Sequence, residues 1–215
     1  MSEEELNEKN KIQQLSTTAR ELYPEMDYEE AEKFKLFQAV KKSFKLLVVR
    51  HPFERLLSAY RDKLENTNLG FEHGTKHFYK KYGAKIVKKY RAAGKEPTFK
   101  EFVRYLIDID LLNYADDHWI PYYLFCTPCL VEYDFVAKVE TLWRDQSYVI
   151  NSTRLRGKIR PGWRHSTKNG HGNESIAAVY FSQLTRSDVE RLYQKYRLDF
   201  ELFDYDVKPY LAYAG

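Results

Sequence analysis

Long apolar runs and cysteines are both scarce in this sequence. No run approaches the roughly 18 apolar residues of a membrane-spanning helix, and the first 20 residues are too polar for a signal peptide. We therefore expect no route into a membrane from the residues given. The only two cysteines, Cys126 and Cys129 in "CTPC", cannot by themselves complete a four-ligand zinc site. We expect no metal, while a local disulfide, a redox pair and two buried thiols all stay open.

The apolar content is high enough for a folded domain. Of the 215 residues, 43% are apolar and 16% are aromatic, which excludes disorder from weak hydrophobicity over most of the chain. The length favours one domain with a sizeable core, or a large piece of one. We find no internal repeat and no low-complexity tract.

Positive charge is concentrated in two blocks, although the net charge is only +4. Residues 76–104 carry ten Lys or Arg against two Glu, and residues 151–171 carry six bases and no acid. The segment between them, residues 105–150, has eight acids against two bases. For an anionic partner, this uneven distribution matters more than the total charge does.

The stretch "KLLVVRHPFERLLSAYRDKLEN", residues 45–66, changes its hydrophobic period in the middle. Leu46 to Val49 is a short apolar run rich in β-branched residues, typical of a parallel strand buried on both faces. From Phe53 the apolar residues recur three and four apart, as on one helical face, and Pro52 suits the first helical position. The stretch predicts a strand, a turn and a helix, in a sheet with helices on both sides.

The same rules of periodicity and capping predict the other elements of the chain. An amphipathic helix with a lysine-rich outer face is predicted over 78–90, where Gly83 lowers the helix propensity. Two further helices are predicted to begin with capping boxes, at Thr98 with Glu101 and at Thr185 with Asp188. A strand is predicted over 132–139 and the longest loop over 151–173.

The junction between the first strand and its helix favours an anion. At the carboxyl end of a parallel strand, the next helix presents unpaired N–H groups and its positive dipole end, the usual ligand position in open α/β sheets. Arg50 ends the strand and can direct a planar fork of donors at a phosphate, and Ser58 can add a hydroxyl two turns into the helix. The other interpretation is that Arg50 pairs with a nearby acid and Ser58 packs against the sheet.

Three blocks of the sequence resemble the Golgi carbohydrate sulfotransferases, the group that includes chondroitin, dermatan and HNK-1 sulfotransferases. They are "VVRHPFERLLSAYRDK", "DDHWIPYYLFCTPCLVEYDFVAKVETLWRD" and "YFSQLTRSDVERLYQKYRLDFELFDYD", in the expected order between about Leu46 and Asp206. The resemblance implies a P-loop-NTPase-like α/β fold and transfer of a sulfuryl group from 3′-phosphoadenosine 5′-phosphosulfate to a sugar hydroxyl of a glycan such as chondroitin or dermatan. It also implies that Arg50 and Ser58 hold the 3′-phosphate of this co-substrate.

The family's 5′-phosphosulfate loop, a "PK-GCT"-like segment, has no counterpart in the 45 residues before Leu46. We therefore expect a helical segment over 1–45 and a partial sulfotransferase domain over 46–215, without the N-terminal strand, the phosphosulfate loop and the family's membrane anchor. Because removal of one oxyanion donor costs roughly 10²- to 10³-fold in rate, we expect no turnover from this chain alone. The alternative to an enzyme is a truncated, non-catalytic remnant that binds nucleotide or glycosaminoglycan.

His118 in "DDHWIP" is the best remaining candidate for the general base that an acceptor hydroxyl needs. Asp116 and Asp117 lie beside it and can orient the ring. Equally, His118 can be a packed residue that caps a helix, with the true base upstream of Met1.

Two basic segments are candidates for binding a sulfated or carboxylated polysaccharide, in particular a glycosaminoglycan. One is the lysine face of residues 76–91, which can also be an ordinary solvated helix face. The other is the loop with the unopposed bases Arg154, Arg156, Lys158, Arg160 and Arg164.

We expect no nucleic-acid partner, because the tyrosines mostly sit at helical spacing on apolar faces, which is typical of a core.

Asn151 and Asn173 each begin a glycosylation sequon, which indicates a secretory compartment. With the resemblance, the sequons predict the lumenal side of the Golgi membrane, reached only through an anchor outside these residues. We expect the CTPC cysteines to form a structural bridge or to be buried thiols. The remaining residues of the family pattern are expected to hold the sheet and its next loop together; they are Tyr133, Asp134, Lys138 and Glu140.

Overall fold

The computed structural model describes residues 41–65, 74–90, 96–160, 162 and 173–215. From Lys45 to Gly215 the chain forms one compact unit, separate from Met1–Phe44. The predictions for residues 1–45, a helical segment without a phosphosulfate loop, fall almost entirely outside the described residues.

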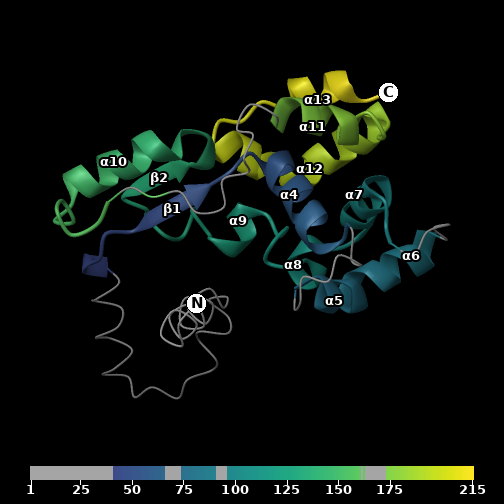
Figure 1. Cartoon of the computed structure of the whole chain (residues 1–215), viewed down its shortest axis with the longest axis horizontal. Helices are drawn as coiled ribbons and strands as arrows, with labels where there is room; N and C mark the ends of the chain where they lie inside the picture. The colour runs from purple at the N-terminus through teal and green to yellow at the C-terminus, as the bar shows by residue number, and fades with distance from the viewer. Residues whose placement is uncertain (1–40, 66–73, 91–95, 161, 163–172) are drawn as a thin grey trace, which may run out of the picture. The chain divides into compact units, whose positions relative to one another are not determined.

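The described elements are mostly short helices around one pair of strands (Figure 1). In chain order they are β1 (Leu46–Val49), α4 (Pro52–Lys63), α5 (Gly74–Phe78), the π-helical turn η2 (Tyr79–Gly83), α6 (Ala84–Tyr90), α7 (Phe99–Asp108), α8 (Leu111–Tyr114), α9 (Tyr122–Phe125), β2 (Phe135–Lys138), the 3-10 turn η3 (Val139–Thr141), α10 (Leu142–Ser152), α11 (Asn173–Phe181), α12 (Arg186–Leu202) and α13 (Lys208–Tyr213).

The first strand is confirmed over Leu46–Val49, and it pairs in parallel with β2, from Leu46 opposite Phe135 to Val49 opposite Lys138. The sequence predicted β2 over 132–139, but the strand is shorter. Asp134 bends the chain before it, because its carboxylate accepts the Lys45 N–H at 2.7 Å. The result is an α/β arrangement with a small parallel sheet flanked by helices.

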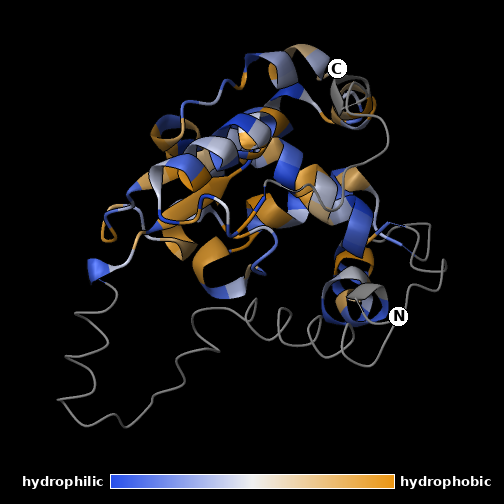
Figure 2. Cartoon of the chain, turned by 60° about the vertical axis from the view of Figure 1, so that its left-hand side comes forward, coloured by the Kyte–Doolittle hydropathy of each residue, from blue (hydrophilic) through white to orange (hydrophobic). Residues whose placement is uncertain are grey.

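The prediction that β1 is buried on both faces is wrong. Leu47 and Val49 are buried against Phe203, Tyr122 and Tyr133, but Leu46 and Val48 are 42% and 41% exposed. The physical reason is that α10 packs on β2 and leaves this side of β1 uncovered in the described part of the chain. Figure 2 shows that the strands are nonetheless hydrophobic, while the helices alternate between apolar and polar residues.

Helix α4 begins where the sequence predicted, with Pro52 in its first turn. His51 caps it, since its ring nitrogen Nδ1 accepts the Phe53 N–H at 3.2 Å. The face that carries Phe53, Leu56 and Tyr60 is buried in the core.

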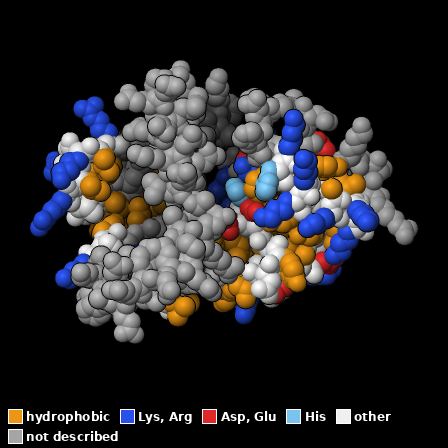
Figure 3. All heavy atoms as spheres, turned by 90° about the horizontal axis from the view of Figure 1, so that it is seen from below, with side chains coloured by type: hydrophobic (Ala, Val, Ile, Leu, Met, Phe, Trp, Pro, Cys, Tyr) orange, Lys and Arg blue, Asp and Glu red, His pale blue; other side chains and the backbone are white. Residues whose placement is uncertain are grey.

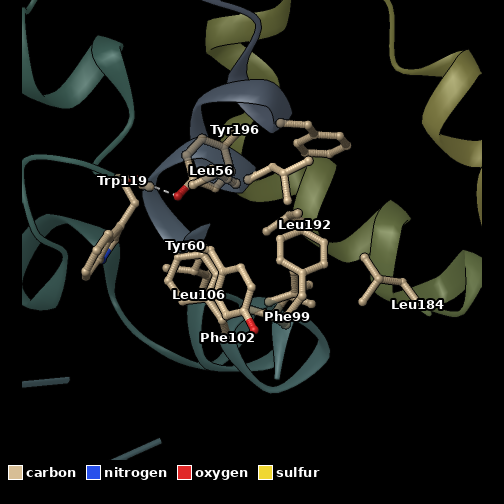
Figure 4. Packing of buried hydrophobic residues seen from close by; sticks show 14 of the residues in the cluster. Leu56, Tyr60, Phe99, Phe102, Leu106, Trp119, Leu184, Leu192 and Tyr196 are labelled. Atoms are coloured by element: carbon tan, nitrogen blue, oxygen red, sulfur yellow. Dashed lines mark hydrogen bonds between the residues drawn. The ribbon is translucent and has the colours of Figure 1, made fainter. Parts of the chain in front are cut away.

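The main core joins α4 to α7 and α12 through large apolar side chains that point toward one another (Figure 4). Phe99 and Phe102 of α7 pack edge-on and stacked against the Tyr60 ring. Tyr196 of α12 is fully buried and donates its hydroxyl to the Trp119 carbonyl oxygen at 2.5 Å. This bond ties the loop that contains His118 to the core.

The predicted helix over 78–90 is interrupted by the π-turn η2. Its backbone bond runs from the Ala84 N–H to the Tyr79 carbonyl oxygen. A Cβ atom at Gly83 would lie 2.7 Å from the Tyr79 ring, so the close approach requires glycine there. The turn places Phe78, Tyr82 and Ile86 in the core.

Both predicted helix starts are confirmed as reciprocal capping boxes, Thr98 with Glu101 and Thr185 with Asp188. The predicted loop over 151–173 is shorter, because Asn151 lies in the last turn of α10 and Asn173 begins α11. In the part of the chain that the structure describes, no helix combines the length and apolarity that a membrane crossing needs.

Candidate functional site

Arg50 occupies the first position after β1, whereas the sequence predicted it as the last residue of the strand. Its side chain is 25% exposed, and Nη2 lies 3.5 Å from Oε2 of Glu54, which is four residues further along the chain in the first turn of α4. The contact is long for an ion pair between partly exposed groups and is worth at most about 1 kcal/mol. Arg50 is therefore loosely held and accessible to an anion.

Ser58 is exposed on α4. It follows Glu54 by one turn of α4, and residues four apart share one side of a helix. Of the other interpretation, the pairing of Arg50 with a nearby acid is confirmed by its contact with Glu54. The packing of Ser58 against the sheet is wrong, because its side chain is exposed on the side of α4 that carries Glu54.

Several backbone N–H groups at this junction already have hydrogen-bond acceptors, whereas the sequence analysis expected them to be unpaired. The Arg50 N–H donates to the Tyr122 hydroxyl at 3.3 Å, and the His51 N–H donates to Glu140 Oε1 at 2.8 Å. The Phe53 N–H is taken by the His51 ring. These three backbone N–H groups are therefore not available to an anion at this junction.

Two glutamates lie close to this junction. Glu54 also accepts the Tyr210 hydroxyl at 2.9 Å, and burial raises its pKa although this bond and Arg50 oppose the shift. Glu140 accepts the Tyr205 hydroxyl at 2.9 Å. Both carboxylates make the site more negative than the sequence analysis assumed. The contact between Glu54 and Arg50 could have been predicted from their (i, i+4) spacing in the sequence.

His51 is enclosed by aromatic rings at the same place. Its ring stacks on Tyr210 with centroids 4.6 Å apart and meets Phe200 and Tyr205 edge-on. Burial lowers its pKa. Because Nδ1 accepts from Phe53, the proton belongs on Nε2, which lies 3.2 Å from the Asp206 carbonyl oxygen.

The residues around β2 that belong to the family resemblance hold the sheet and the next loop together, as expected from the sequence. Tyr133 donates its hydroxyl to the Cys126 carbonyl oxygen at 2.8 Å, and Asp134 binds the Lys45 N–H. The Lys138 N–H donates to Asp145, and Lys138 Nζ to the Asp204 carbonyl oxygen at 3.2 Å.

The His118 ring is hydrogen-bonded to Asp116 and partly exposed. Its Nδ1 lies 2.6 Å from Asp116 Oδ1, and its side chain is 45% exposed. Asp116 also accepts the Tyr82 hydroxyl at 3.1 Å. Burial raises the pKa of Asp116, but the hydrogen bonds from His118 and Tyr82 outweigh it and hold the pKa below its usual range. This geometry differs from the packed helix cap that was the other interpretation.

Arg55 links the two candidate regions and was missed in the sequence. Its guanidinium lies 4.1 Å from the centre of the Tyr122 ring and donates to the Ile120 carbonyl oxygen. Since Tyr122 accepts the Arg50 N–H, the segment after His118 contacts the end of β1 directly. The role of Arg55 was hard to predict from the sequence, because an arginine beside a buried helix face normally extends to solvent.

The basic loop lies elsewhere. It follows α10, at the opposite end of Figure 1 from α5 and α6. Its bases are exposed, and none of them forms an ion pair with an acid in the described ranges; Arg164 lies outside those ranges. The described members are Arg154, Arg156, Lys158 and Arg160.

Neither cysteine is bridged in the structure. Cys126 is half-buried beside Leu47 and Val49, and Cys129 is exposed. Asn151 is exposed, as a glycosylation acceptor must be, whereas the side chain of Asn173 lies outside the described residues. Among the described His, Cys, Asp and Glu side chains, no cluster of three or more could hold a metal ion.

The model of the sulfotransferase family matches residues 3–206. This match begins upstream of Leu46, where the motif resemblance starts. No solved structure matches the chain.

Curated relatives agree with the family match. Carbohydrate sulfotransferase 11 of Rattus norvegicus is 35% identical over 183 residues, which are 80% of this chain and 49% of that protein. Carbohydrate sulfotransferase 14 of Homo sapiens is 38% identical over 168 residues, 75% of this chain and 42% of that protein. For carbohydrate sulfotransferase 8 of Homo sapiens the identity is 36% over 177 residues, 77% and 40% of the two chains. The chain spans less than half the length of these relatives, and it belongs to the sulfotransferase family.

Proposed function

We propose that this chain carries the donor-binding and acceptor-binding side chains of a carbohydrate sulfotransferase. The reaction moves a sulfuryl group from 3′-phosphoadenosine 5′-phosphosulfate to a sugar hydroxyl of a glycan such as chondroitin or dermatan, in the Golgi lumen. The observation that carries the proposal is the accessible Arg50 at the end of β1, with the exposed Ser58 on the same side of α4.

Arg50 and Ser58 bind the 3′-phosphate of the donor in this proposal. A guanidinium fork matches two phosphate oxygens, and a serine hydroxyl donates to a third. Arg50 must exchange its long contact with Glu54 for the phosphate, which costs little because that contact is weak.

His118 acts as the general base. With its Nδ1 proton directed at Asp116, Nε2 carries the lone pair that takes the proton from the acceptor hydroxyl. The oxygen then attacks the sulfuryl group, and the bond to the nucleotide phosphate breaks. Asp116 holds the ring in this tautomer and stabilises the imidazolium that forms.

The unopposed bases of the loop after α10 contact the acidic glycan further from the reacting hydroxyl. Arg154, Arg156, Lys158 and Arg160 are exposed for this role, and we include Arg164 with them. Glycosylation at Asn151 and Asn173 fits a lumenal enzyme.

Calorimetric titration with adenosine 3′,5′-bisphosphate tests the phosphate site. We expect Arg50→Ala to weaken binding by roughly tenfold or more and Ser58→Ala by less, since hydrogen bonds to charged groups contribute about 1.5–3 kcal/mol. Arg61→Ala is the control, because Arg61 lies on α4 and pairs with Glu65 four residues further on, as Arg50 pairs with Glu54. Adenosine 5′-monophosphate, which lacks the 3′-phosphate, should bind wild type and Arg50→Ala equally. Equal affinity of wild type and Arg50→Ala for the bisphosphate would remove Arg50 from the site.

The expectation that the chain alone does not turn over stays a prediction. Incubation with radiolabelled sulfate donor and desulfated chondroitin measures it, and labelled product would prove it wrong. If product forms, His118→Ala should reduce its rate by roughly 10²- to 10⁴-fold.

A further inference from the structure

Four exposed lysines run along α5, η2 and α6 without carboxylate partners. Lys76, Lys80, Lys85 and Lys88 form no ion pair with any acid in the ranges that the structure describes. Their neighbours Lys81 and Lys89 are different, because they pair with Asp116 and Asp108 at 3.6 and 2.9 Å. We call the four unpaired residues the lysine row.

The π-turn aligns the lysine row. In an ordinary α-helix, residues five apart diverge around the axis, but a π-turn adds one residue to the turn. The bond from the Ala84 N–H to the Tyr79 carbonyl oxygen sets this spacing between Lys80 and Lys85. The row then spans about 18 Å from Lys76 to Lys88 at the usual helical rise.

The opposite face of the same segment fixes the row toward solvent. Phe78, Tyr82 and Ile86 are buried in the core. Seen from below in Figure 3, Lys and Arg side chains gather on the side where α5 and α6 lie. Unpaired like charges held this way repel one another, so a bound polyanion would relieve the repulsion.

The lysine row lies on the helical segment that packs against the loop of the candidate base. The Phe78 ring meets the His118 ring edge-on with centroids 5.0 Å apart. Lys81 Nζ and the Tyr82 hydroxyl both contact Asp116, whose carboxylate accepts from His118. A chain bound along the row therefore lies on the segment that contacts His118.

We propose that the lysine row binds an extended acidic polysaccharide and guides it to His118; this inference rests on the proposed function. The buried positions of Phe78 and Tyr82 favour a polysaccharide over single-stranded nucleic acid, because these two rings are not available for bases to stack on. The row, more than the distant basic loop, then sets how tightly an acidic acceptor binds.

The test is a titration with size-defined chondroitin sulfate oligosaccharides at two salt concentrations, without nucleotide. The variant Lys76→Gln/Lys80→Gln/Lys85→Gln/Lys88→Gln should bind roughly tenfold or more weakly, and with a shallower salt dependence. Glutamine keeps the helix propensity of these exposed positions, and circular dichroism checks the fold.

The matched control removes the same charge elsewhere. Arg186→Gln/Arg191→Gln/Arg197→Gln/Lys208→Gln changes four exposed cations on α12 and α13, of which the three arginines already pair with acids. It should bind within about twofold of wild type if position matters more than net charge. As a second measurement, bound oligosaccharide should protect the lysine row, but not Lys208, from acetylation in mass-spectrometric footprinting.

Three results would overturn the inference: no loss in the lysine-row variant, an equal loss in the control, or tighter binding of single-stranded DNA of the same charge. The proposed function is tested independently, because its nucleotide titration involves Arg50 and no polysaccharide. The lysine-row variant should keep wild-type affinity for adenosine 3′,5′-bisphosphate.

Discussion

Arg50 and Glu54 are one helical turn apart, and their contact competes with a phosphate for the same guanidinium. Glu54→Gln keeps an acceptor for the Tyr210 hydroxyl but removes the negative charge. We expect the variant to bind adenosine 3′,5′-bisphosphate up to about fivefold more tightly, since a partly exposed ion pair is worth about 0.2–1 kcal/mol.

Calorimetry on Glu54→Gln and on Glu65→Gln measures this effect. Glu65 pairs with Arg61 on the same helix and serves as the control. Weaker binding by Glu54→Gln, with Glu65→Gln unchanged, would show that the carboxylate supports the site instead of competing with it.

Thr127 stores backbone strain in the CTPC turn. Its φ of 45° lies in the left-handed region, which β-branched residues rarely adopt. Thr127→Gly should raise the free energy of unfolding by about 1 kcal/mol, because the relief of strain exceeds the extra chain entropy that glycine loses. Urea unfolding measures it, and Thr127→Ala, which keeps Cβ, should gain less. A glycine variant less stable than wild type would show that the turn is not strained.

At the scale of elements, Asp145 joins α10 to β2. Its carboxylate accepts the Lys138 N–H at 2.9 Å and the Thr141 hydroxyl at 2.6 Å. Burial raises the pKa of Asp145, but these hydrogen bonds and Arg144 outweigh it, so its pKa is lowered. The carboxylate therefore stabilises the fold above its unfolded pKa of about 3.9, and this stability is lost as the pH falls through the lower folded pKa.

Asp145→Asn should cost about 2 kcal/mol of unfolding free energy at neutral pH, because one acceptor becomes a donor that faces two donors. The difference from wild type should shrink as the pH falls below about 4. Thermal unfolding across this range measures both effects. A difference that stays constant from pH 7 to about pH 3 would contradict the assignment of the charge.

The elements that local rules govern were predictable, and those that depend on distant contacts were not. Pro52 and the residues after Phe53 specify α4 by periodicity, and Thr98 specifies the start of α7 by capping. The exposed side of β1 depends on where α10 lies, which no local pattern encodes. The π-turn depends on the close approach of Gly83 to Tyr79. From the sequence, Gly83 indicated only a lowered helix propensity at this position.

At the scale of the whole molecule, the sequence predicted that Arg50 and Ser58 lie where β1 is followed by α4, but it did not predict the residues that surround them. Asp116 was expected to orient His118 because it is near in sequence, and it does. Glu140 lies 89 residues from His51, and the hydrogen bond between them appears only in the folded chain. Such long-range bonds take the backbone donors that a strand–helix junction would otherwise offer to an anion.

The proposed function depends above all on the binding of the 3′-phosphate of the nucleotide by Arg50. A crystal structure of the chain with adenosine 3′,5′-bisphosphate tests this contact most directly. We predict the Arg50 guanidinium at about 2.7–3.0 Å from the 3′-phosphate oxygens, with its contact to Glu54 released. A bound nucleotide elsewhere, with Arg50 still on Glu54, would contradict it.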